Sequence, residues 1–148
     1  MTINNLQPHH FDYKNLNTLF DVELATGDLK EKKEKNGNIP LISAGKYKNG
    51  IVKLIAQTDE SNIFPAGCIT IDMFGKSFYQ NKQFYSVSHG RVNILKPKQP
   101  MDEVVGLYFV TVLDKSLGQY TFNKMCCKKQ LEKEKIYQKT KRKTSSFR

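Results

Sequence analysis

The segment spanning residues 39–95 constrains the fold more than any other part of the chain. Short runs of β-branched and aromatic residues alternate there with loops made of Gly, Lys, Asn and Ser. This pattern is typical of short strands joined by tight turns, with glycine where a turn needs positive φ. We therefore expect strands at residues 39–43, 51–56, 68–73, 77–79, 84–87 and 91–95.

One of these strands alternates clearly between two faces. Ile69 and Ile71 fall on one side, whereas Cys68 and Thr70 fall on the other. Before the segment, residues 16–22 favour a short helix or turn. The charged residues 27–38 favour a solvated loop or hairpin, because their signs are mixed and they end near Asn-Gly.

Helical signals follow the strand-rich part. Asp102 is placed to cap a helix that runs to about Leu117, where Gly118 ends it. A second helix is expected over residues 124–137. The chain is therefore predicted to have an α+β fold: a curved, mostly antiparallel sheet with one buried helix and a C-terminal helix pointing away. Residues 1–15 are expected to form a flexible lead-in, and residues 138–148 a basic disordered tail.

Size and composition fit one domain with a real core, since 39% of the 148 residues are hydrophobic. No apolar run approaches the ~18 residues of a membrane span. The N-terminal residues are polar and lack a signal-peptide core. The three cysteines form no spaced set that suggests metal binding or a disulfide framework. These features predict a cytoplasmic protein.

The net charge of +10 is unevenly distributed. Ten of the 24 Lys and Arg residues lie from Lys124 onward, where there are only two Glu, so the rest of the chain is nearly balanced. A basic tail attracts any polyanion and carries no sequence information. A non-specific nucleic-acid-binding protein that acts through its tail is therefore one alternative function. The loops of the body are the better evidence for specific recognition.

Enzyme classes find little support in the sequence. Asp28-Leu29-Lys30 formally matches part of a metal-nuclease signature but lies in a polar loop. Gly75-Lys76-Ser77 lacks the upstream glycine of a phosphate-binding loop. No nucleophile elbow or methyltransferase motif is present, and the three histidines form no metal-ligand pattern. We expect no catalytic residues, no metal site and no cofactor bound by the chain itself.

Two loops between the expected strands carry donors suited to DNA. In the first, Lys46 and Lys48 offer ammonium groups for phosphates, and Asn49 offers an amide for a base edge. The alternative is an ordinary hairpin with a solvated tip, because Asn-Gly is a strong turn signal.

The second loop is the stronger candidate. Lys76 can neutralise a phosphate, and Tyr79 and Gln80 offer donors or a stacking surface. Alternation sends Tyr79 and Gln80 to opposite faces, so both reach DNA only if the strand bends. Further along, His89 and Arg91 are additional candidates. Their alternatives are a structural histidine and a surface ion pair.

Several pieces, in this order, resemble one known family. They are LFDV at residues 19–22, GDLKEKKEKNGNIPLISAG at 27–45, ITIDMFGKSFYQ at 69–80, VNILKP at 92–97 and YTFNK at 120–124. Their order and spacing resemble the target recognition domain of type I restriction-modification specificity subunits. The resemblance covers roughly residues 15–137, with the recognition domain at 16–123 and a stub of the spacer helix at 124–137.

The resemblance implies a non-enzymatic reader of half of a bipartite DNA target. The implied partners are double-stranded DNA, methyltransferase subunits that bring S-adenosylmethionine, and restriction subunits that use ATP and Mg²⁺. A homodimer is compatible with it, and no membrane is involved. A methyltransferase-docking module that does not touch DNA is a further alternative. Because only one recognition domain is present and the spacer pattern breaks down after Tyr137, we expect a truncated or split subunit.

Overall fold

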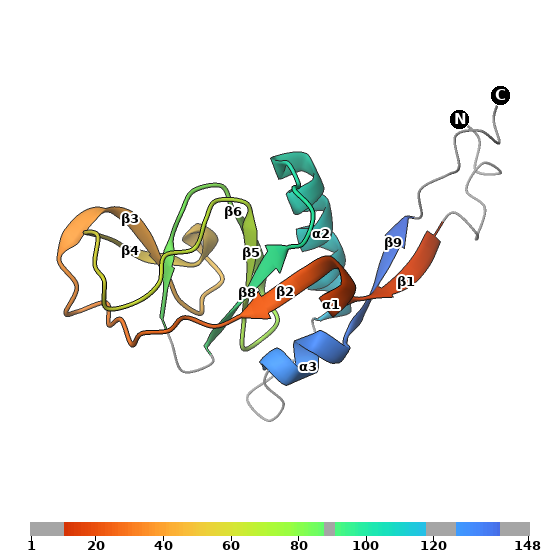
Figure 1. Cartoon of the computed structure of the whole chain (residues 1–148), viewed down its shortest axis with the longest axis horizontal. Helices are drawn as coiled ribbons and strands as arrows, with labels where there is room; N and C mark the ends of the chain where they lie inside the picture. Colours follow the sequence, from red (N-terminus) through yellow and green to blue (C-terminus); the bar gives the residue numbers. More distant parts are fainter. Residues whose placement is uncertain (1–10, 88–90, 118–126, 140–148) are drawn as a thin grey trace.

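The computed structural model describes residues 11–87, 91–117 and 127–139. An antiparallel sheet of four strands lies in the middle of the elongated molecule (Figure 1). Its strands, in spatial order, are β2 (Phe20–Glu23), β8 (Val92–Pro97), β5 (Cys68–Asp72) and β6 (Ser77–Gln80). The four strands come from distant parts of the chain, so the sheet ties the first and second halves together.

A second sheet of three strands forms the lobe on the left of Figure 1. Its order is β4 (Ile51–Ile55), β3 (Asn36–Ile42) and β7 (Tyr85–Ser86). The β3–β4 pair is antiparallel with register shifts, whereas β3 and β7 pair in parallel. The predicted α+β class with mostly antiparallel strands is confirmed. The strands are divided among three sheets in place of one curved sheet.

Helix α2 (Glu103–Ser116) packs beside β6 and β5. The predicted cap is confirmed, because the Asp102 side chain accepts a hydrogen bond from the Val105 amide. Gly106 allows close packing: a Cβ at this position would lie 2.3 Å from the Tyr79 ring. The predicted buried helix is therefore present, and it is buried along the stripe formed by Gly106, Phe109 and Leu113.

Two hydrophobic clusters lie on opposite faces of the central sheet. The first contains Ile69 and Ile71 and is covered by the helices, with Phe109 of α2 packed edge-on against Phe20. The second contains Cys68 and is shared with the three-stranded sheet. The alternation predicted for β5 is therefore confirmed, and each face of the strand belongs to a different core.

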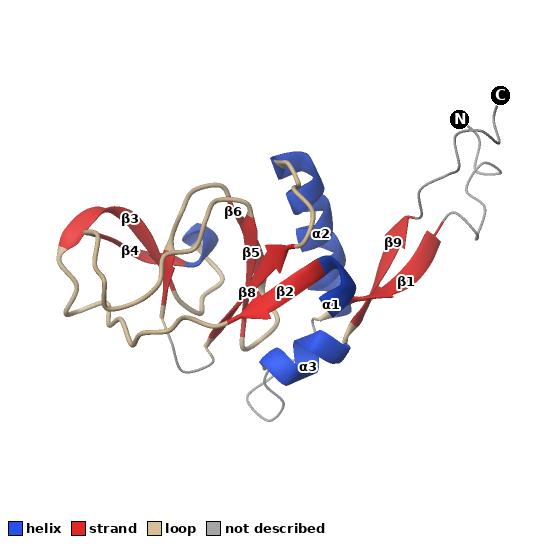
Figure 2. Ribbon diagram, in the orientation of Figure 1, coloured by secondary structure: helices blue, strands red, loops and turns tan. Residues whose placement is uncertain are grey.

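The two ends of the described chain depart most from the prediction. Helix α1 (Leu16–Leu19) fits the expected short helix, but β1 (Phe11–Asn15) precedes it where a flexible lead-in was predicted. Helix α3 (Lys128–Lys133) is short and gives way to β9 (Lys135–Lys139), which pairs antiparallel with β1 (Figure 2).

The predicted helix over residues 124–137 is therefore wrong at residues 135–137, which belong to β9. The apolar residues there are too sparse to form one helical stripe, and a strand partner more than a hundred residues away is invisible to local pattern. Gly118, residues 124–126 and most of the predicted tail lie outside the described residues. The division into domains stays a prediction.

None of the helices in the described ranges is both long and apolar enough to cross a membrane.

Candidate nucleic-acid interface

The loop of residues 43–50 connects β3 to β4 and presents its tip to solvent. It is closed by hydrogen bonds from the Ser43 amide to the Gly50 carbonyl (2.9 Å) and from the Gly50 amide to the Tyr47 carbonyl (3.0 Å). Lys46, Tyr47 and Lys48 are exposed, and Tyr47 keeps 83% of its surface accessible. The loop therefore displays two ammonium groups and one aromatic ring.

The backbone of this loop is in an unusual conformation. Lys48, Asn49 and Gly50 have φ values of 53°, 59° and 77°. Residues other than glycine seldom adopt positive φ. Each one in this conformation carries a strain energy on the order of 1–3 kcal/mol, so it persists only where the surrounding structure enforces it. At Gly50, a Cβ would also lie 3.3 Å from both the Ile42 side chain and the Ser43 carbonyl. Glycine is therefore required there.

A pair of side-chain amides enforces the strained turn. Asn49 Nδ2 donates to the Tyr79 carbonyl (3.1 Å) and to Gln80 Oε1 (3.0 Å). Gln80 Nε2 in turn donates to the Asn49 carbonyl (3.0 Å) and to Thr70 Oγ1 (3.0 Å). We call Asn49, Gln80 and Thr70 the amide clamp. It links the 43–50 loop to β5 and β6 of the central sheet.

The clamp changes the interpretation of Gln80. Sequence reasoning placed this residue on the surface as a base contact, but only 3% of it is exposed and its amide is fully engaged within the protein. A buried amide with all its partners satisfied rigidifies its surroundings. In the folded chain Gln80 holds a loop in place.

Lys76 also makes contacts within the protein. Its ammonium lies 3.2 Å from Asp114 Oδ2 on α2 and 5.1 Å from the centre of the Phe78 ring. Asp114 further accepts from the Ser77 amide (3.1 Å) and hydroxyl (2.8 Å). The side chain of Lys76 remains about one-third exposed. The predicted phosphate contact is thus sterically available, but Lys76 already has an anionic partner.

Tyr79 packs against α2 at Gly106 and is partly exposed. Desolvation, followed by the nearby carboxylates of Glu103 and Asp102, raises the pKa of its hydroxyl. The hydroxyl is therefore protonated at neutral pH and keeps its ability to donate a hydrogen bond.

Arg91 is exposed and borders a hollow of about 520 Å³ that is also lined by Val52 of the three-stranded sheet. We call this feature the basic hollow. Four cationic residues line it together with two acidic ones, Asp28 and Glu31; the cationic residues are Lys30, Lys32, Lys33 and Arg91. His89, the neighbouring candidate, lies outside the described residues.

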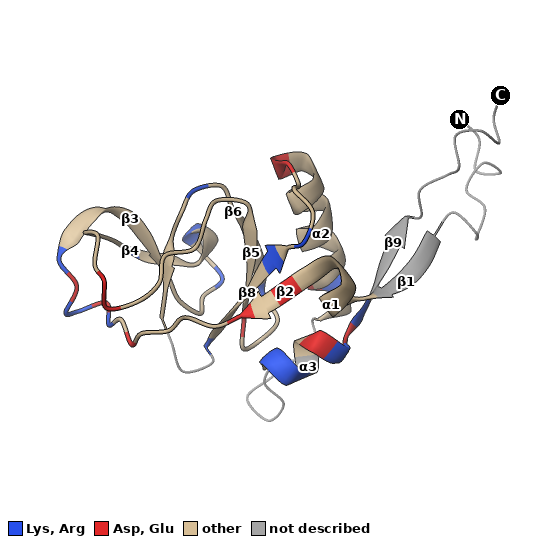
Figure 3. Cartoon of the chain, in the orientation of Figure 1, with Lys and Arg blue, Asp and Glu red and all other residues tan. Residues whose placement is uncertain are grey.

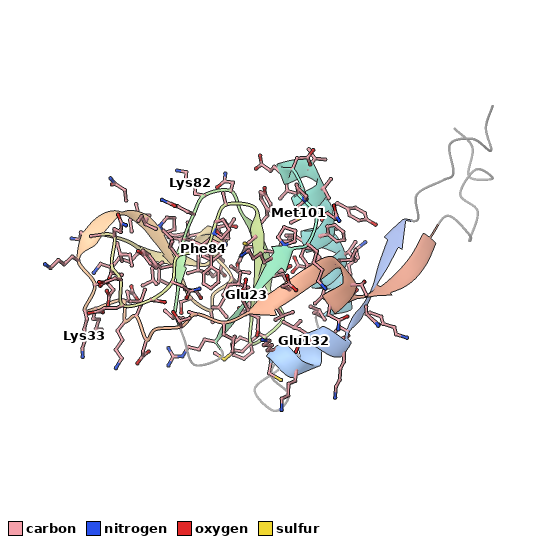
Figure 4. The ribbon with its side chains drawn as sticks, viewed as in Figure 1. Glu23, Lys33, Lys82, Phe84, Met101 and Glu132 are labelled. Atoms are coloured by element: carbon pink, nitrogen blue, oxygen red, sulfur yellow. The ribbon has the colours of Figure 1, made fainter. Side chains whose placement is uncertain are left out.

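The lysines of the basic hollow sit on an ordered turn. The ammonium of Lys53, on β4, donates to the backbone carbonyls of Glu31 (2.9 Å) and Glu34. Figure 4 shows Lys33 at the free end of this lobe, pointing away from the ribbon. Sequence reasoning missed these lysines because Glu31 lies among them and Asp28 and Glu34 lie beside them, which suggested an ordinary solvated loop of mixed charge (Figure 3). The only available signal was the three lysines within residues 30–33.

The nuclease-like triplet at residues 28–30 is not part of a metal-binding cluster of acidic side chains in the described chain. Asp28 and Lys30 of the nuclease-like triplet lie on the surface with their charged atoms 3.7 Å apart, while Leu29 between them is buried. Across residues 11–87, 91–117 and 127–139, no group of three or more His, Cys, Asp or Glu side chains is arranged to hold a metal ion.

Solved structures show where this fold recurs. The chain superposes on the S subunit of a type I restriction-modification system from M. genitalium with a TM-score of 0.67 and 15% identity. It also superposes on the HsdS subunit from Thermoanaerobacter tengcongensis (TM-score 0.60, 17% identity). A third match comes from a structure of type I system assembly and conformational transition (TM-score 0.65, 20% identity).

These superpositions cover 88%, 90% and 90% of this chain but 35%, 34% and 35% of the solved chains, respectively. The chain therefore spans about a third of the length of the S subunits that it resembles. The comparison with curated proteins finds no match. The model of the type I restriction modification DNA specificity domain matches residues 8–138, which is most of the sequence. The chain therefore belongs to the family of type I restriction-modification DNA specificity domains.

Proposed function

We propose that this chain is a non-catalytic module that reads a short sequence in double-stranded DNA. The observation that carries the proposal is the 43–50 loop, a fixed turn that exposes Lys46, Tyr47 and Lys48. Ammonium groups suit phosphates, and a rigid backbone suits the recognition of base edges, because recognition requires a defined geometry. Membership of the DNA specificity domain family supports the same conclusion.

The proposed mechanism divides the contacts into two classes. Lys46, Lys48 and Arg91, with the lysines of the basic hollow, would neutralise phosphates and set the orientation on the duplex. Base edges would be read by the 43–50 loop, where each good contact contributes about 1–3 kcal/mol of discrimination. Lys76 and Tyr79 remain proposed contacts at the edge of this surface, and His89 is proposed on sequence alone.

The proposed partners follow from the family. A single domain of this length would specify half of a bipartite target, and a second domain or a second copy of the chain would supply the other half. Methyltransferase subunits carrying S-adenosylmethionine, and restriction subunits using ATP and Mg²⁺, would perform the chemistry. The similarity to S subunits, of which this chain spans about a third, supports this arrangement.

The proposal is tested by the salt dependence of DNA binding. Each lysine that neutralises a phosphate adds about one unit to the slope of log affinity against log salt. We expect the double variant Lys46→Gln/Lys48→Gln to lose about two units of slope on any duplex sequence. The affinity can be measured by fluorescence anisotropy at several salt concentrations.

Lys98→Gln is the matched control, because Lys98 is an exposed lysine outside the 43–50 loop whose ammonium lies 3.8 Å from Asp21 Oδ1. Its slope should match that of the parent chain. If Lys46→Gln/Lys48→Gln also left the slope unchanged, the DNA-contacting face would have to lie elsewhere, and the observation behind the proposal would be removed.

The basic C-terminal region offers a competing route to DNA, since many of the cationic residues lie there. The variant Lys141→Gln/Arg142→Gln/Lys143→Gln tests it. A chain that binds only through this region would lose affinity for all sequences alike and up to about three units of salt slope, and it would show no sequence preference. A recognition domain would bind more weakly but keep its preference among sequences.

A further inference from the structure

Tyr47 is strongly exposed and does not contribute to either hydrophobic cluster of the domain. Its ring belongs to neither hydrophobic cluster and keeps 83% of its surface accessible, the highest value among the exposed large hydrophobic side chains of the described chain. Four of the other exposed large hydrophobic side chains lie on α2, and Leu24, Leu54 and Ile63 lie elsewhere. Within the 43–50 loop, Tyr47 is the only exposed large hydrophobic side chain.

The neighbours of Tyr47 indicate what would cover it. Lys46 and Lys48 flank it, and both are exposed. A duplex groove presents phosphates on both sides of an inner surface of base edges. That arrangement matches an aromatic side chain placed between two ammonium groups. A tyrosine ring can contact a thymine methyl group, and its hydroxyl can donate to or accept from a base edge.

The backbone under Tyr47 is held before any partner binds. The two residues that follow Lys46 and Tyr47 in the turn, Lys48 and Asn49, adopt positive φ, and the amide clamp fixes them to the buried Gln80. Gln80 is in turn anchored to Thr70 in the central sheet. Ordering a loop on binding costs affinity, and a loop that is already ordered avoids that cost.

We propose that Tyr47 is the specificity-determining side chain of the 43–50 loop, and that Asn49 and Gln80 are positioning residues that act through it. The inference rests on the proposed DNA-reading function. It adds which residue contacts the bases and which residues hold that residue in position. Tyr47 contacts the base edges of one or two adjacent base pairs, while Lys46 and Lys48 contact the flanking phosphates.

The first test compares sequence discrimination before and after removal of the ring. The motif preferred by the parent chain is selected from random duplex DNA, and every single-base variant of it is then titrated. Tyr47→Ala is expected to reduce discrimination at one or two adjacent positions by roughly 5- to 150-fold, leaving the other positions unchanged. Tyr47→Phe separates the ring from the hydroxyl.

Tyr108→Ala is the matched control, since Tyr108 is a partly exposed tyrosine on α2. It should leave discrimination intact at all positions. If Tyr47→Ala kept full discrimination at every position of a motif that the parent chain does select, the inference would be overturned while the proposed function stood. If the parent chain selected no motif, both would fail together.

The second test concerns the amide clamp. Asn49→Gly removes the amide but accepts positive φ without strain, so it releases the clamp while sparing the turn. It avoids the risk that a change at the buried Gln80 simply unfolds the domain. Asn49→Gly is expected to lower discrimination at the positions that Tyr47→Ala affects. It should add less than about twofold in the Tyr47→Ala background.

A merely structural Asn49 would behave differently. Its loss would lower the midpoint of thermal unfolding and reduce affinity for all sequences alike, with no change in the pattern of discrimination. A uniform loss of affinity of this kind would refute the positioning role. Full additivity of Asn49→Gly with Tyr47→Ala would refute it as well.

Discussion

At the scale of single residues, the thiol of Cys68 shows how burial sets chemistry. The side chain is 1% exposed, and desolvation raises its pKa from 9.0 to about 11; Lys96 lowers it and Glu23 raises it to smaller extents. The native state therefore holds this proton more tightly than the unfolded state. The stability linked to it is complete below about pH 9 and is lost as the pH rises towards 11.

This linkage is measurable by urea unfolding at pH 8 and about pH 10.5. The parent chain should lose about 2 kcal/mol of unfolding free energy through Cys68 over that interval. Cys68→Ala should lose less, since only other groups, including Tyr79, whose pKa is also raised, still contribute. An equal loss in both proteins would contradict the buried, protonated thiol.

The sequence predicted which residues of the candidate interface are polar or charged, but it did not predict which of them are exposed and which hold the loop in place. Lys46 and Lys48 lie where an Asn-Gly turn predicts an exposed tip, and both are exposed. Gln80 also reads as a surface residue in the sequence. In the structure it is buried and hydrogen-bonded to Asn49, which lies 31 residues away along the chain. Side-chain hydrogen bonds over such separations leave no periodic trace.

At the scale of secondary-structure elements, Asp114 is the main polar connection between α2 and β6. Its carboxylate accepts from the Ser77 amide and hydroxyl and pairs with Lys76. Hydrogen bonds to a charged group contribute about 1.5–3 kcal/mol where they are shielded from water, and this group is one-third exposed. Because partial exposure weakens these contacts, we expect Asp114→Ala to lower the unfolding free energy by about 1–2 kcal/mol.

Asp21→Ala provides the comparison for that prediction. Asp21 is an exposed acid whose only described ion pair, with Lys98, spans 3.8 Å. Such surface pairs contribute about 0–1 kcal/mol. Both variants can be measured by chemical denaturation, and equal effects would show that the contacts of Asp114 do not hold the helix against the sheet.

The elements with strong local signals were predictable, and those made by distant pairing were not. Helix α2 has a capping aspartate and a buried stripe, and β5 alternates between two cores. By contrast, β1 and β9 exist because they pair with each other from opposite ends of the described chain. A two-stranded ribbon is marginally stable on its own, and each strand depends on its distant partner. The local pattern of residues 135–137 carries no sign of that partner, so a helix was predicted there.

At the scale of the whole molecule, the central sheet separates two regions with different surfaces. The helices cover one face, and α2 leaves several apolar side chains exposed. The three-stranded sheet covers the other face and carries both the 43–50 loop and the basic hollow. The amide clamp crosses between the regions, because Asn49 lies in the outer loop whereas Gln80 and Thr70 belong to the central sheet.

The family could be inferred from the order of several weak motifs, none of which is diagnostic alone. The match over residues 8–138 confirms that inference. The target bases could not be predicted, because they depend on where a few side chains such as Tyr47 reach across a groove, and this geometry is set by tertiary contacts.

The most direct test of the account is a selection from random duplex DNA at physiological salt, using the full chain. The chain and its variant Lys141→Gln/Arg142→Gln/Lys143→Gln are selected in parallel and the enriched sequences compared. We expect both to enrich the same short motif, because discrimination resides in the body of the domain. Retention of DNA without any common motif would contradict the account and leave only non-specific binding.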